Sequence, residues 1–191
     1  MEATTTYFDK PGRDNTDEVM RVASARAAAL GIRTVVVATN TLATAFKAQE
    51  AFSGCTVVAV THVTGFTGPD KQEFTPEDRK RFEDRGGVVQ TAAHAFGGLQ
   101  RSLAKEGTYP APGLSIGDVI AQALRTFGQG TKVCLEIATM AADAGLVRSD
   151  EDCIAIGGSG GGADTALVLR PSYTHRFFGS RVHEVICKPR L

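Results

Sequence analysis

The sequence predicts an α/β protein, a three-layer α/β/α sandwich around a mostly parallel sheet. Three observations lead to this fold class. Short β-branched segments alternate regularly with helical patterns along the 191 residues. Two of these segments, Thr34–Ala38 and Thr56–Thr61, are apolar throughout, which is typical of strands that helices cover on both faces. No linker or internal repeat interrupts the chain, so we expect a single domain over residues 1–191.

The other strands and the first helices follow from similar local signals. Asn15, with Glu18 three residues later, predicts a capped helix start, and the helical spacing of apolar residues then continues to Gly31. Thr75 followed by Pro76 predicts a second helix, which is so strongly charged that we expect it on the surface. Further strands are predicted at Thr6–Phe8, Val88–Thr91, Cys153–Ile156, Ala166–Arg170 and Val182–Cys187.

Two helices are predicted in the second half of the chain. Ser115 is a good N-cap for the first of them. Its apolar residues fall on one stripe: Val119, Ile120, Ala123, Leu124 and Phe127. The next helix, at about Lys132–Ala144, is apolar almost all round, so we expect it to be buried.

Composition and charge exclude several classes of function. Lys+Arg and Asp+Glu both number 21, so no net field attracts nucleic acid or anionic lipid. No apolar run approaches the roughly 20 residues that a membrane span needs, and the first residues lack the pattern of a secretory signal. The four cysteines and four histidines are scattered without metal-ligand spacing. We therefore expect a cytoplasmic protein with no metal, no membrane partner and no nucleic-acid partner.

The turn after Thr34–Ala38 is the first candidate site. It joins the carboxyl end of a buried strand to a helix, which is where open α/β sheets bind ligands. The amides of a helix start, surrounded by hydroxyl and amide side chains, suit a phosphate. The alternative is that Thr39 or Thr41 merely caps the helix. The candidate residues are Thr39, Asn40, Thr41 and Thr44.

The glycine cluster after the strand at Cys153–Ile156 is the second candidate. It leads into another strand and no Lys-Ser or Lys-Thr follows, which excludes a dinucleotide fingerprint and a P-loop. A nest of backbone amides could still hold an anion, and the alternative is a flexible glycine hairpin. The candidate residues are Gly158, Ser159, Gly160, Gly161, Gly162, Asp164 and Thr165.

Two more loops offer ligand contacts. His62, Gly65 and Phe66 follow the strand Thr56–Thr61 and suit a planar hydrogen-bonding ring, although a lone histidine is more often structural. The early loop brings Lys10, Arg13 and Asn15 to a helix start, where they suit a phosphate or form a solvated charged turn. No nucleophile–base pair is visible, so the sequence assigns no catalytic residue.

These segments resemble a known family. VCLEIATMAADAG at Val133–Gly145 and IAIGGSGGGADTALVLRP at Ile154–Pro171 resemble the carboxyl-terminal domain of pyruvate kinase. The turn Thr39–Ala45 resembles the phosphate loop of that domain. With YFDKPGRDNT at residues 7–16 and THVTGF at 61–66, the chain is more similar to small stand-alone proteins of this family. The resemblance implies an α/β/α sandwich with a mostly parallel five-stranded core sheet and added edge strands.

The resemblance also implies functions. In pyruvate kinase this domain is regulatory and the catalytic barrel lies elsewhere, so we expect no pyruvate kinase activity. Leu42-Ala43 replaces the Gly-Arg pair of the effector loop, which disfavours a sugar phosphate. The stand-alone proteins are similar to FMN binders, which implies FMN, with its phosphate at Thr39–Thr44 and its ring against Gly158–Gly162, near His62.

Three functions remain open from the sequence. The first is a small protein that binds a phosphate-bearing ligand. The second is a regulatory subunit that senses an effector or a partner protein. The third is a flavin-dependent oxidoreductase in which His62 or Glu136 handles protons. A homo-oligomer is compatible with all three.

Overall fold

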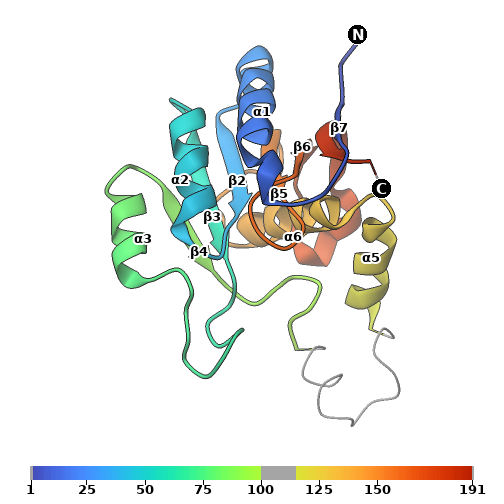
Figure 1. The fold of residues 1–191 in the computed structure, drawn as a ribbon. Helices are drawn as coiled ribbons and strands as arrows, with labels where there is room; N and C mark the ends of the chain where they lie inside the picture. Colours follow the sequence, from blue (N-terminus) through green and yellow to red (C-terminus); the bar gives the residue numbers. More distant parts are fainter. Residues whose placement is uncertain (1, 100–114, 191) are drawn as a thin grey trace.

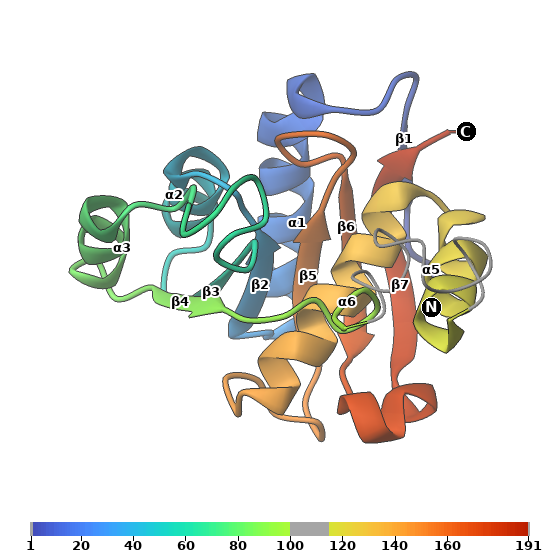
Figure 2. The ribbon, with the colours of Figure 1, turned by 90° about the horizontal axis from the view of Figure 1, so that it is seen from below.

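A mixed sheet forms the centre of the molecule. The structure is a computed structural model and describes residues 2–99 and 115–190. The described chain forms one sheet in the order β1-β7-β6-β5-β2-β3-β4, in which only β6 runs antiparallel to its neighbours. Figures 1 and 2 show this order across the molecule. The strands are β1 (Thr6–Phe8), β2 (Thr34–Ala38), β3 (Thr56–Thr61), β4 (Val88–Thr91), β5 (Cys153–Gly157), β6 (Thr165–Arg170) and β7 (Arg181–Pro189).

The predicted fold class is confirmed. Five strands from β6 to β4 form the core of the sheet, and β7 and β1 are added at one edge. Helices α1 (Thr16–Leu30), α2 (Leu42–Ala51) and α3 (Pro76–Glu83) cover one face, whereas α6 (Gln129–Asp143) covers the other. Helix α5 (Ile116–Arg125) packs against α6. Figure 2 shows α6 in front of the sheet and α1 behind it.

Strand β2 shows why the core is continuous. Val35 and Val37 point into the cluster under α1 and α2, whereas Val36 points into the cluster under α6. All three valines have no exposed surface. A strand buried on both faces needs apolar residues at every position, which is the pattern that predicted it.

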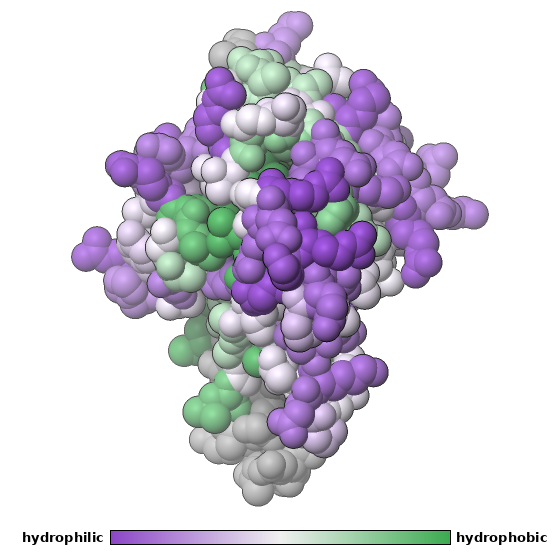
Figure 3. Space-filling model, turned by 90° about the vertical axis from the view of Figure 1, so that its left-hand side faces the viewer, coloured by the Kyte–Doolittle hydropathy of each residue, from purple (hydrophilic) through white to green (hydrophobic). Residues whose placement is uncertain are grey.

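Helix α3 lies on the surface, as its charge predicts. Thr75 caps it, because the Asp78 amide donates to Thr75 Oγ1 at 3.1 Å, and Pro76 takes the first helical position. Phe82 is its one buried residue. Figure 3 shows the side of the molecule where α3 lies, and hydrophilic residues gather there.

Helix α5 buries only part of its apolar stripe. Ser115 caps it as expected, with the Asp118 amide 3.1 Å from Ser115 Oγ. The apolar stripe, however, is not uniformly buried: Val119 and Phe127 are 57% and 62% exposed. The helix turns Gly117 inward, where a Cβ would lie 2.5 Å from the Phe96 carbonyl oxygen. The close approach of the glycine backbone therefore decides which side of α5 packs.

The start of α1 differs from its prediction. Asn15 does not cap the helix, because it is the last residue of a 3-10 turn, Arg13–Asn15, and already has a helical backbone conformation. Its side chain turns back and donates to the carbonyl oxygens of Lys10 and Gly12 at 2.8 and 3.1 Å. Glu18 forms an ion pair on the helix surface instead. Asn15 thus shapes the preceding loop.

The cysteines are free thiols. Cys134, Cys153 and Cys187 are buried and Cys55 is partly buried. Burial raises the pKa of Cys153 and of Cys187 to about 12, so these thiols stay protonated at neutral pH. Within residues 2–99 and 115–190, no helix is both long and apolar enough to span a bilayer.

Candidate functional site

A pocket of about 820 Å³ lies at the carboxyl edge of the sheet. Strands β2, β3 and β5 all end there, and helix α6 forms one wall. In α/β sheets, this edge is the usual position of a ligand site. The structure brings ten of the predicted site residues to this pocket: Thr39, Asn40, Thr41, Thr44, His62, Phe66, Gly158, Gly160, Gly161 and Gly162.

Three helices begin at this pocket. Thr16 is the first residue of α1, Thr41 is the N-cap of α2, and Gln129 is the first residue of α6, and all three line the pocket. Each helix start carries partial positive charge and amides without intrahelical partners. Their convergence favours an anionic ligand.

Charged side chains add to this field. Among the residues that the structure describes, four cationic side chains line the pocket: Arg13, Lys47, Arg125 and Lys132. Two carboxylates, Glu73 and Glu136, accompany them. Lys47 of α2 also pairs with Asp17 on α1. Among the described residues, no group of three or more His, Cys, Asp or Glu could hold a metal ion.

The turn between β2 and α2 is shaped mostly by its backbone. The Thr39 amide donates to the Val60 carbonyl oxygen at 3.0 Å, and the Thr39 hydroxyl donates to the Thr41 carbonyl oxygen. Thr41 makes no side-chain capping bond to the first turn of α2. The structure therefore does not support the alternative in which the hydroxyl of Thr39 or Thr41 caps α2. Asn40 and Thr44 line the pocket beside them.

The glycine loop after β5 needs its glycines. Gly160, Gly161 and Gly162 have φ angles of 79°, 124° and 65°, which residues other than glycine rarely adopt. A Cβ on Gly162 would lie 2.5 Å from Thr16 Oγ1 and 2.6 Å from Arg13 Cα. The loop thus packs against the start of α1 instead of forming a loose hairpin.

A buried carboxylate holds this loop. Asp164 has no exposed surface and accepts hydrogen bonds from the amides of Gly12 (2.9 Å) and Ser159 (3.0 Å). The Thr165 hydroxyl donates to its other oxygen at 2.8 Å. Thr16 adds a further link, since its hydroxyl accepts from the Ala163 amide at 3.0 Å. We call these four side-chain links, from Asp164 and Thr16, the clamp.

Six predicted site residues are not part of the pocket wall. The Ser159 amide, the Asp164 carboxylate and the Thr165 hydroxyl belong to the clamp, so these polar groups are used inside the protein. Asn15 binds the backbone of its own loop, and Gly65 donates its amide to the Lys71 carbonyl oxygen in a turn. The six are Lys10, Asn15, Gly65, Ser159, Asp164 and Thr165.

Three aromatic rings meet on another side of the pocket. The ring centroid of Phe66 lies 4.1 Å from that of His62 and 5.3 Å from that of His94, and the two histidine rings are 5.5 Å apart. These separations are typical of interacting rings, and such clusters stack on planar ligands. Sequence reasoning missed His94, which follows β4 and reaches this cluster only through the fold.

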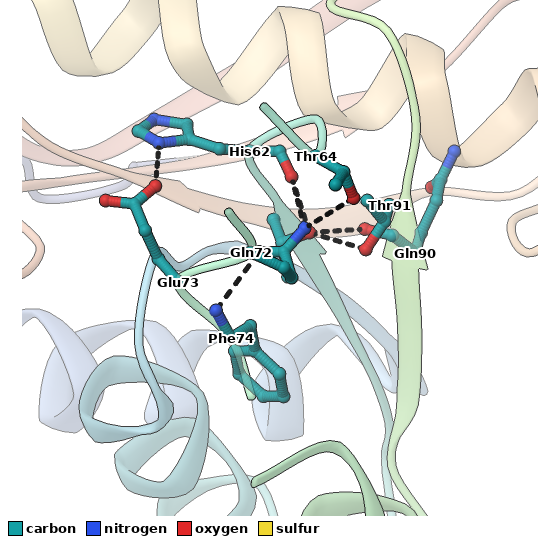
Figure 4. Close-up of polar contacts among 8 residues, drawn as sticks. His62, Thr64, Gln72, Glu73, Phe74, Gln90 and Thr91 are labelled. Atoms are coloured by element: carbon teal, nitrogen blue, oxygen red, sulfur yellow. Dashed lines mark hydrogen bonds and ion pairs between the residues drawn. The ribbon is translucent and has the colours of Figure 1, made fainter. Parts of the chain in front are cut away.

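His62 has a carboxylate partner. Its Nδ1 lies 2.7 Å from Glu73 Oε2, as Figure 4 shows. The Gln72 amide nitrogen donates to the His62 carbonyl oxygen at 3.1 Å and so holds this loop back on itself. A carboxylate at Nδ1 orients the imidazole and fixes which nitrogen carries the proton. Sequence reasoning missed Glu73, because ten residues of irregular chain separate it from His62.

A buried ion pair lies in the α6 wall. Lys132 Nζ contacts Glu136 Oε2, and the two side chains are only 7% and 6% exposed although both line the pocket. The Phe96 amide donates to Glu136 Oε1 at 3.1 Å. Sequence reasoning noted Glu136 but missed Lys132. The available signal was a Lys and a Glu four residues apart in an otherwise apolar helix.

The fold and the pocket define an α/β domain in which strand ends, a glycine loop and helix starts surround a pocket at the carboxyl edge of the sheet. Residues 17–169 match the family model described as "Pyruvate kinase, alpha/beta domain", which is well over half of the chain. The chain therefore belongs to this family, and the resemblance expected from its sequence is confirmed.

Two solved structures illustrate the relationship. A pyruvate kinase from Cryptosporidium parvum matches over 82% of this chain, with 16% sequence identity and a TM-score of 0.43. A Cryptosporidium parvum pyruvate kinase in complex with ADP matches over 90%, with 15% identity and a TM-score of 0.39. In both cases the match covers 23% of the pyruvate kinase chain, so this chain spans less than a quarter of their length.

Proposed function

We propose that this chain binds a small phosphate-bearing ring ligand, FMN, in the pocket at the carboxyl edge of the sheet. The observation that carries the proposal is that one pocket combines two different surfaces. One surface favours an anion, and the other presents three aromatic rings. A ligand with a phosphate at one end and a planar ring at the other satisfies both.

The anion-favouring surface suits the phosphate. It contains the start of α2 at Thr41–Thr44, the glycine loop and the side chains of Arg13 and Lys47. The proposal thus assigns the glycine loop to the phosphate, whereas the expectation from the sequence placed the ring against it. Backbone amides at a helix start and in a glycine nest hold phosphate groups in many proteins. The clamp keeps the glycine loop in place before any ligand arrives, so little ordering is needed on binding.

The aromatic surface suits the ring. Phe66 is 37% exposed and stacks with His94 at an interplanar angle of 26°. A sugar phosphate would leave this surface without a stacking partner, whereas a flavin ring would cover it. Bound FMN would supply hydride and electron transfer.

The first experiment is the visible absorption spectrum of the purified protein, followed by titration of FMN fluorescence. We expect a flavin band or saturable quenching of added FMN. A colourless protein that leaves FMN fluorescence unchanged at high protein concentration contradicts the proposal.

Variants localise the ligand. Phe66→Leu should weaken FMN binding about fivefold or more, the effect of roughly 1 kcal/mol of lost stacking. Phe178→Leu is the matched control, because Phe178 is 80% exposed and is not part of the pocket. Replacing Thr39 and Thr44 by Ala should also weaken binding, and an unchanged affinity would refute the placement of the phosphate.

A flavin-dependent oxidoreductase is the second candidate, and the His62–Glu73 pair favours it. An imidazole oriented by a carboxylate can accept or deliver a proton beside the ring. Stopped-flow mixing of the FMN-loaded protein with NADH or NADPH separates the two functions, since a binder shows no reduction. For either function we propose that no pyruvate kinase activity is present, which a coupled assay with phosphoenolpyruvate and ADP tests.

A further inference from the structure

The ion pair Lys132–Glu136 is hard to explain as a source of stability. Desolvating each ion costs several kcal/mol, and apolar residues in place of a buried pair are often equally stable or more so. The rest of this part of α6 is apolar, with Val133, Ile137 and Met140 beside the pair. A charged pair placed among such residues at a pocket wall points to recognition of a ligand.

Helix α6 holds the pair in a fixed position. A Cβ on Gly130 would lie 2.0 Å from Thr165 Oγ1, and one on Gly157 would lie 2.9 Å from the Gly130 carbonyl oxygen. The start of α6 is thus packed directly on strands β5 and β6. The Phe96 amide fixes Glu136 from the other side at 3.1 Å. The two charged groups therefore meet a ligand with a preset geometry.

The chemistry of the pair defines what it can recognise. An ammonium has three N–H donors, and a carboxylate accepts at several lone pairs, so their mutual contact uses only part of each. The pocket wall thus presents a donor and an acceptor side by side. The complementary group is a carbonyl next to a ring N–H, which is the edge of an imide or a lactam.

We propose that Lys132 and Glu136 read the imide edge of the ligand's ring. Lys132 Nζ donates to a ring carbonyl oxygen, and the Glu136 carboxylate accepts from the neighbouring ring N–H. The inference rests on the proposed function, because the isoalloxazine ring of FMN carries such an imide. It places the residues that determine which ring is bound on α6, and not in the turn or the glycine loop.

The test compares FMN with N3-methyl-FMN, which keeps both carbonyls but lacks the imide N–H. A hydrogen bond to a charged group contributes about 1.5–3 kcal/mol, so the wild-type protein should bind the methylated ligand at least tenfold more weakly. This comparison needs no variant. If FMN binds and the two affinities are equal, the inference is wrong and the proposed function stands. If neither ligand binds, the proposed function fails and this inference fails with it.

Variants distinguish hydrogen bonding from simple crowding around the methyl group. Lys132→Met/Glu136→Gln removes both charges and keeps an acceptor for the Phe96 amide. We expect the ratio of the two affinities to fall severalfold in this variant, because neither the cation nor the anionic acceptor remains to bind the imide edge. Lys47→Met is the control: it weakens both ligands and leaves their ratio unchanged. A ratio that stays at its wild-type value in the double variant overturns the inference.

Discussion

The glycine loop at 158–163 and the turn at 39–44 both follow a buried strand and both line the same pocket, but they use their polar groups differently. The glycine loop is held by side chains from outside it, since Asp164 and Thr16 bind its amides. The turn has one internal side-chain bond, from Thr39 to the Thr41 carbonyl oxygen, while Asn40 and Thr44 line the pocket.

This difference distinguishes residues that stabilise the fold from residues that can contact a ligand. A backbone amide has one N–H donor, so an amide already bound to Asp164 or Thr16 stabilises the fold and has no donor left for a ligand. A polar group at a pocket wall contributes little to stability and can bind. Substitutions in the clamp should therefore change stability most, and substitutions in the turn should change affinity most.

Removal of the Asp164 carboxylate should have the largest effect. Asp164→Ala leaves the Gly12 and Ser159 amides without their acceptor, so we expect a loss of about 3–5 kcal/mol in the free energy of unfolding. Asp84→Ala is the control, because it breaks an exposed ion pair worth less than about 1 kcal/mol. Urea denaturation followed by circular dichroism measures both. Equal losses in the two variants would show that the clamp does not support the fold.

Two glycines in the same loop provide a sharper test. Gly162→Ala forces a Cβ to 2.5 Å from Thr16 Oγ1, in addition to its positive φ, so we expect a loss of about 2–4 kcal/mol. Gly160→Ala has a similar φ of 79° but no atom within 4 Å of the new Cβ, so only the conformational cost of about 1 kcal/mol remains. Thermal unfolding should rank the two variants in this order, and the reverse order would contradict the packing of the loop on α1.

The same substitution in both regions separates their roles. Thr16→Val removes the acceptor for the Ala163 amide, so it should cost about 1–2 kcal/mol of stability. Thr44→Val should leave stability within about 0.5 kcal/mol, because Thr44 is a partly buried residue of the pocket wall. FMN titration should show the larger loss of affinity in Thr44→Val once both proteins are folded. A larger stability loss in Thr44→Val would reverse the comparison.

The fold could be predicted because its signals are local. Strand β2 and strand β3 are valine-rich and apolar at nearly every position, and the structure gives both the expected bounds. Local sequence signals do not determine which side of a helix packs against the rest of the protein. The apolar stripe on α5 does not show which of its residues pack: Val119 is exposed, and the missing side chain of Gly117 allows another face to approach Phe96.

The site could be predicted only where residues directly follow a strand. Phe66 and Thr44 were found because strand ends in a parallel sheet share one edge. Glu73 and His94 were missed, since only the path of the chain brings them to His62. Lys132 was missed because its helix has the pattern of a core element, and nothing local shows that one side of such a helix borders a pocket.

The smallest predicted effect concerns an ion pair that fastens the second half of α1, away from the clamp. Arg26 Nε donates to Glu184 Oε2 on β7 at 2.6 Å, and this hydrogen bond lowers the pKa of Glu184 below its ordinary value. A lowered carboxyl pKa contributes stability that is present above the ordinary glutamate pKa and is lost as the pH falls through the folded-state value. Glu184→Gln should therefore be slightly less stable than the wild type at pH 7, and this difference should be smaller at about pH 3. Its FMN affinity at pH 7 should be unchanged, because the pair does not border the pocket. Thermal unfolding at the two pH values and one titration check this, and a loss of affinity would show that the whole of α1, not only its clamped start, positions the glycine loop.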